Sequence, residues 1–169
     1  MSTSPVRIFV KTQFNGTGAS SILLSIGLVS DGADECYVEL PATGLHLAGA
    51  PPELLARVVS QFGRVPGARV GDRIGMSDRV AAFLSSFAAP IALSYDCKVD
   101  LTHLQTLVGQ TPDVFARIRM VDIAKETSSP TSKQARSDQL AACVSRRIGD
   151  HHALAEALAL KAAWLATPT

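Results

Sequence analysis

The sequence has little of what marks several large classes of protein. Its three cysteines, Cys36, Cys97 and Cys143, are scattered and include no C-x-x-C pair, which favours free or buried thiols in a reducing compartment. Aromatic residues make up 5% of the chain and the formal net charge is +1, so bulk composition demands neither nucleic acid nor a membrane as partner. No apolar run approaches the roughly 18 residues of a membrane-spanning helix, and no charged N-terminal segment precedes an apolar one. These absences predict a cytoplasmic protein with no membrane partner.

What the chain does contain is enough apolar sequence for one sizeable core. Hydrophobic residues make up 47% of the 169 residues, which argues against disorder and predicts a single domain over residues 1–169. Residues 114–165 carry a mild basic excess, with eight Lys or Arg against five Asp or Glu. A solvated helix face explains this excess at least as well as a track for phosphates does.

Hydrophobic periodicity predicts three strands, then helices that alternate with strands, then two closing helices. We expect Asp31-Gly32 to form a hairpin turn, and Ser77 and Asp150 to cap helices. The expected strands are 6–12, 20–30, 35–40, 90–95 and 114–121, and the expected helices are 51–62, 77–87, 98–108, 132–148 and 150–166. This order predicts an α/β protein whose mixed sheet, an antiparallel meander followed by parallel strands, is flanked by helices.

Three segments stand out, one early, one central and one at the last helix. Lys11-Thr12-Gln13-Phe14 resembles a strand ending in Asp-Thr-Glu-Phe, and residues 93–101 resemble a strand that delivers an Asp to the start of a helix. Residues 151–157 resemble the pattern His, any residue, Ala, Leu, any residue, Asp, Ala. In this order they resemble the motifs of the DEDDh 3′–5′ exoribonucleases of the ribonuclease T type, which have an RNase H-like fold. The resemblance spans nearly the whole chain.

The resemblance implies hydrolysis of phosphodiester bonds by two Mg²⁺ or Mn²⁺ ions, which four carboxylates hold while a His acts as general base on the attacking water. His151 matches the general base and Glu156 matches the last carboxylate. Asp100 matches the middle carboxylate, with Asp96 as the alternative, although capping of the helix at 98–108 explains either Asp equally well.

The opening motif departs from the family, because Lys11 and Gln13 stand at the first two carboxylate positions. Counting Lys11 as +1 and two carboxylates as −2, the formal charge of the site falls from about −4 to about −1. A stable two-metal site is therefore not expected, and Mg²⁺ or Mn²⁺ binding should be weak or absent.

Three functions follow from this pattern. The first is an exonuclease-like domain that has lost most or all hydrolysis and is retained as a nucleic-acid-binding or regulatory module. The second is an active metal-dependent 3′–5′ exonuclease that uses Asp100, His151 and Glu156. The third is a protein-interaction or structural module. Single-stranded RNA or DNA and a second copy of the chain are the expected partners, with Phe14 and Asn15 as candidate contacts to nucleic acid.

Overall fold

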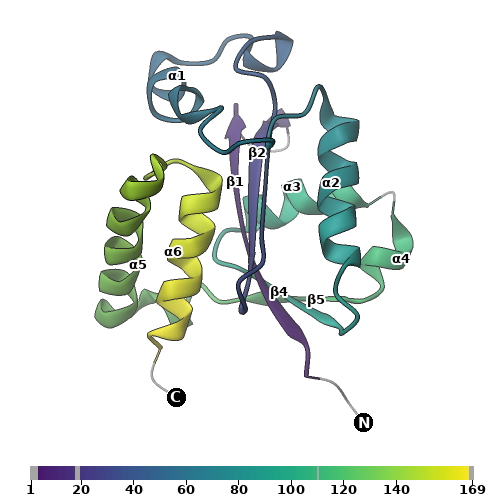
Figure 1. Ribbon diagram of the computed structural model, residues 1–169, viewed down its shortest axis with the longest axis vertical. Coiled ribbons are helices and arrows are strands. Elements are labelled where there is room, and N and C mark those ends of the chain that lie inside the picture. Colours follow the sequence, from purple (N-terminus) through teal and green to yellow (C-terminus); the bar gives the residue numbers. More distant parts are fainter. Residues whose placement is uncertain (1–3, 18–19, 110, 168–169) are drawn as a thin grey trace.

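A five-stranded mixed sheet lies between two layers of helices in the computed structural model, which describes residues 4–17, 20–109 and 111–167 (Figure 1). The strands are β1 (Val6–Asn15), β2 (Ile22–Ser30), β3 (Glu35–Glu39), β4 (Ile91–Tyr95) and β5 (Ile118–Asp122). The helices are α1 (Pro52–Arg57), α2 (Arg73–Ser85), α3 (Lys98–Val108), α4 (Pro112–Phe115), α5 (Pro130–Cys143) and α6 (Ala153–Leu165). In the described part of the chain, no helix is long and apolar enough to cross a membrane.

The strand order is β3-β2-β1-β4-β5, so the first strand of the chain is the middle strand of the sheet. β1 pairs antiparallel with β2, and β2 pairs antiparallel with β3. On its other side β1 pairs parallel with β4, which pairs parallel with β5. The predicted α/β class, with a meander continued by parallel strands and flanked by helices, is confirmed.

Helices α5 and α6 cover one face of the sheet, and α2 and α3 cover the other (Figure 1). The alternation of side chains along β1 serves both layers: Ile8 and Val10 join the core beneath α2 and α3, while Phe9 packs against Leu160 of α6. α6 approaches the sheet closely at Gly27, where a Cβ atom would lie 2.5 Å from the Ala153 carbonyl oxygen. Only glycine permits this separation of strand and helix backbones.

Two predicted helices begin at different residues from those expected. α2 begins at Arg73, because Asp72 accepts a hydrogen bond from the Gly75 amide at 2.9 Å. Ser77, the predicted cap, instead donates its hydroxyl to the Leu107 carbonyl at 2.7 Å. α6 begins at Ala153, since His151 adopts a left-handed φ of 64° that cannot continue a helix, and Asp150 is therefore not its N-cap.

Other differences concern the lengths of elements. β1 runs to Asn15 through a bulge, whereas the expected strand ends at residue 12. The helix predicted at 51–62 stops at Arg57, and its expected apolar face is buried only in part: Val58 is buried, but Leu55 is 43% exposed. The strand predicted at 114–121 begins at Ile118, since residues 112–115 form the short helix α4. α3 and β4 agree with their predicted ranges to within one residue.

Candidate functional site

The early and central segments of the sequence meet where β1, the end of β4 and the first turn of α3 converge. Because β1 and β4 are parallel neighbours, residues late in β1 lie at the same end of the sheet as the residues that follow β4. The Lys11 ammonium lies 3.0 Å from Asp96 Oδ1 and 2.8 Å from Asp100 Oδ2. The Lys11 side chain is only 9% exposed, so this is a largely buried ion-pair cluster.

Both aspartates that the sequence proposed as alternatives therefore belong to one cluster. Asp100 Oδ1 accepts hydrogen bonds from the Thr12 amide at 2.9 Å and the Thr12 hydroxyl at 2.7 Å. The cap residue of α3 is Cys97, which makes no side-chain capping bond, so neither aspartate is the N-cap of that helix. Both oxygens of Asp100 are thus committed to β1, one to Thr12 and one to Lys11.

Arg136 on α5 completes the cluster from the opposite layer. Its Nη1 atom donates to Asp96 Oδ2 at 2.7 Å, so Asp96 bridges two cations. Nothing in the sequence pattern pointed to Arg136, because it lies 40 residues from Asp96 and follows no motif. Its position depends on how α5 packs beside α6.

Electrostatics keep this cluster charged over a wide pH range. Burial alone would lower the pKa of Lys11, but the attraction of Asp100 and Asp96 outweighs it and raises the pKa above its ordinary value. Burial likewise disfavours the ionised form of Asp96, yet Lys11 and Arg136 lower its pKa. At neutral pH the Lys11 ammonium and the Asp96 carboxylate therefore both carry their charges.

The last segment of the sequence forms a second cluster at the start of α6. The His151 amide donates to Glu156 Oε1 at 3.1 Å and to Asp150 Oδ1 at 3.1 Å. His151 Nε2 lies 3.3 Å from Asp150 Oδ2, and ligand atoms of the three side chains all lie within 4.8 Å of one another. Asp150, expected only to cap a helix, is thus brought to the predicted His151 and Glu156.

The two clusters interact electrostatically through Glu156. Burial raises the pKa of this carboxyl, and the charges of Lys11 and Arg136 offset part of that rise. The structure therefore brings five of the predicted site residues into one region, namely Lys11, Asp96, Asp100, His151 and Glu156.

The remaining predicted residues follow Lys11 along β1. Gln13 is half-buried just before the bulge. The half-buried Phe14 ring lies against the His103 ring, with centroids 5.1 Å apart. Asn15 is buried, and its amide donates to the carbonyls of His46 at 3.1 Å and Ala48 at 3.3 Å, which ties the segment before α1 to the sheet.

The first cluster does not fit two divalent cations. Lys11 and Arg136 contribute +2 and Asp96 and Asp100 contribute −2, which leaves a formal charge of about 0 against the +4 of two such ions. The ammonium also occupies the space between the two aspartates that a metal ion would need. The Asp150–His151–Glu156 cluster has a donor set suited to a single ion.

In comparisons with known proteins, no family model matches this chain and no curated protein matches it. The case for its function therefore rests on the residues themselves and on their arrangement.

Proposed function

We propose that the chain is an RNase H-like domain of the DEDDh 3′–5′ exoribonuclease type that has lost hydrolysis and binds single-stranded nucleic acid. The order of the sheet supports this proposal, because a meander continued by parallel strands is the arrangement that the resemblance implies. The three motif-like segments also converge on one region, as catalytic segments of one site must.

The observation that carries the proposal is the position of the Lys11 ammonium, 2.8 Å from Asp100 and 3.0 Å from Asp96. A divalent cation would be repelled by a buried positive charge at this distance, and the carboxylates it would need are already engaged. The bonds from Thr12 and Arg136 hold these carboxylates in place. The ion-pair cluster therefore maintains the architecture of the site without the metal that hydrolysis requires.

The decisive experiment restores the acidic opening motif with Lys11→Asp and Gln13→Glu together. We expect the double variant to bind more Mn²⁺ than the wild type, measured by calorimetry and by loss of the free-ion EPR signal. The matched control is Lys133→Asp with Gln134→Glu, which makes the same charge change at two exposed neighbouring residues on α5. A folded double variant that binds no more Mn²⁺ than this control would show that the motif assignment is wrong.

The loss of hydrolysis is tested on the wild type. A 3′-labelled single-stranded RNA should keep its length in the presence of Mg²⁺ or Mn²⁺. Stepwise shortening that EDTA abolishes would contradict this half of the proposal.

An active nuclease is the second candidate function, and one observation favours it. Asp150, His151 and Glu156 present one nitrogen and two carboxylate ligands within 4.8 Å of one another, enough to hold a single divalent ion. Under this alternative, RNA shortening by the wild type would be abolished by Glu156→Gln. The same reaction would survive Lys11→Met, because Lys11 supplies no ligand atom to that cluster.

A further inference from the structure

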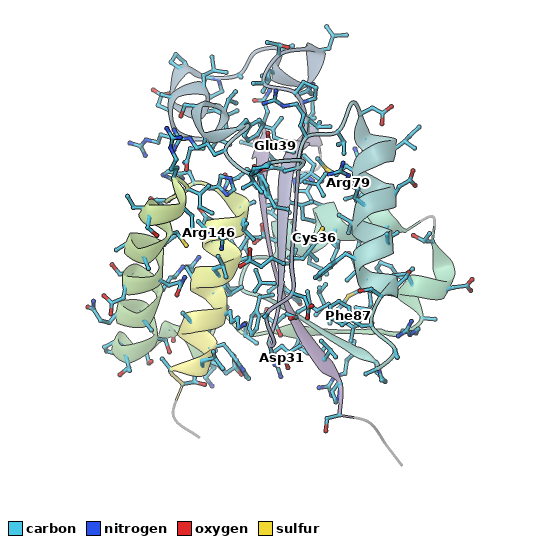
Figure 2. All side chains as sticks on the ribbon, in the orientation of Figure 1. Asp31, Cys36, Glu39, Arg79, Phe87 and Arg146 are labelled. Atoms are coloured by element: carbon cyan, nitrogen blue, oxygen red, sulfur yellow. The ribbon has the colours of Figure 1, made fainter. Side chains whose placement is uncertain are left out.

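A second region of positive charge lies at the connection between α5 and α6, outside the clusters described above. A surface pocket of about 450 Å³ is hollowed there, and Phe62, Gly63, Arg64 and Arg147 line it. Figure 2 shows the neighbouring Arg146 at the end of α5 that lies toward α1. The pocket thus combines an aromatic ring with two guanidinium groups.

The two arginines of the pocket carry charges that no carboxylate neutralises among the described residues. Arg64 donates to the carbonyl oxygens of Arg147 at 2.7 Å and Ser60 at 3.1 Å, which fixes its orientation without cancelling its charge. Arg146 differs, because it forms a bidentate ion pair with Glu35 at 2.9 and 2.7 Å. The positive charge of the pocket is therefore available to an anion.

The pocket is rigidly joined to the start of α6. Gln61 is buried, and its side chain accepts from the Gly149 amide at 3.0 Å and donates to the Asp150 carbonyl at 2.6 Å. This bridge fixes the segment that carries Phe62 and Arg64 against the residue that precedes His151. A chain held in the pocket would lie beside the Asp150–His151–Glu156 cluster.

We propose that this pocket binds one nucleotide unit of a single-stranded nucleic acid, with Arg64 and Arg147 on the phosphate and Phe62 beneath the base. Guanidinium groups pair with phosphate through charge-assisted hydrogen bonds, and an aromatic ring stacks on any base without sequence preference. This inference rests on the proposed function, since it states where the strand crosses the surface on its way to His151 and Glu156.

Arg147→Gly is the most informative variant, because Arg147 has a left-handed φ of 62° that glycine adopts without strain. The substitution removes the guanidinium while the melting temperature should stay the same or rise. Lys133→Ala is the matched control, since it removes an exposed cation from the first turn of α5, at the other end of that helix. Binding is measured as the fluorescence anisotropy of a short labelled oligouridine at several salt concentrations.

We expect Arg147→Gly to weaken binding about ten-fold, the loss of one charge-assisted phosphate contact. The slope of log affinity against log salt should fall by about 0.7 for each phosphate contact removed. Lys133→Ala should bind as the wild type does. Phe62→Ala should weaken binding with no change in the salt slope, because stacking releases no counterions.

Two outcomes would overturn the inference, and they differ in what they say of the proposed function. If the wild type binds the oligonucleotide and Arg147→Gly binds equally well, the strand lies elsewhere and only the inference fails. If the wild type does not bind the oligonucleotide at all, the inference and the nucleic-acid-binding half of the proposed function fail together. Competition by inorganic phosphate as strong as that by uridine monophosphate would show a simple anion site and would likewise overturn the role of Phe62.

Discussion

Replacement of Lys11 by methionine tests the buried ion-pair cluster directly. Methionine keeps most of the length of the side chain and removes only the charge, which leaves Asp96 and Asp100 without the ammonium at 3.0 and 2.8 Å. Removal of one partner from a buried ion pair costs about 3–5 kcal/mol. Because Asp96 keeps Arg136 and Asp100 keeps its bonds from Thr12, we expect the lower end of that range, about 3 kcal/mol at pH 7.

The pH dependence of the cluster's contribution to wild-type stability follows from the directions of the pKa shifts of Asp96 and Lys11. Asp96 has a lowered pKa, so its contribution to wild-type stability is present above its unfolded pKa of about 3.9 and is lost as the pH falls through the lower folded value. Lys11 has a raised pKa, so its contribution is present below about pH 10 and is lost as the pH rises through the folded value. Between these limits the cluster contributes a constant stability.

In the Lys11→Met variant Asp96 loses the charge of Lys11, which lowers its pKa in the wild type, and its pKa rises. The difference in unfolding free energy from the wild type should therefore shrink as the pH falls from 7 toward 4. Urea unfolding at several pH values measures this difference, with Lys133→Met as an exposed control. Addition of Asp100→Asn to Lys11→Met should recover much of the loss. A loss below about 1 kcal/mol that does not change with pH would refute the buried cluster.

Two further substitutions test the core around α6. Both ring nitrogens of His152 are buried without a hydrogen-bond partner among the described residues, so His152→Phe should raise the unfolding free energy at pH 7 by about 1–2 kcal/mol. Because the folded pKa of His152 is lowered from 6.5 to about 4, wild-type stability should fall as the pH drops below 6.5, and this part of the acid loss should vanish in the variant under urea titration. Gly27→Ala would place a Cβ atom 2.5 Å from the Ala153 carbonyl oxygen and should lower the melting temperature by an amount corresponding to about 2–3 kcal/mol. Gly71→Ala, where the added Cβ meets nothing within 4 Å, should not lower it.

Periodicity in the sequence predicted those elements that bury a regular apolar pattern. α3 follows this rule: Leu104, Leu107 and Val108 are buried and the helix has the predicted bounds. The segment 51–62 has an equally regular pattern but lies over the end of the sheet, where Leu55 stays 43% exposed and Gln61 turns inward to bind Gly149 and Asp150. Tertiary contacts determine where the helix in residues 51–62 ends, and the hydrophobic periodicity of the segment does not predict these contacts.

The residues of the candidate site likewise divide into those that a sequence pattern predicted and those that only tertiary packing brings to the site. The resemblance predicted Lys11, Asp100 and His151 as site residues because each lies within a motif. Arg136 and Asp150 were missed as site residues, since one is delivered by the packing of α5 and the other by the left-handed turn at His151. The sequence offered Asp96 and Asp100 as alternatives for one position. In the structure both belong to the site, because the Lys11 ammonium forms an ion pair with each of them.

The central position of β1 has a consequence for synthesis on the ribosome. β1 leaves the ribosome before the other strands and helices of this domain. Lys11 can meet Asp96 only after 85 more residues have been made, and Phe9 can pack against Leu160 only after α6 has been made. At about 5–20 residues per second, the interval between synthesis of Asn15 and of Ala153 is on the order of ten seconds. During that time the nascent chain can form the β1-β2-β3 meander but exposes its apolar faces. Chaperones that shield emerging hairpins should therefore associate with this chain while it is being made, and release it only when α6 has emerged.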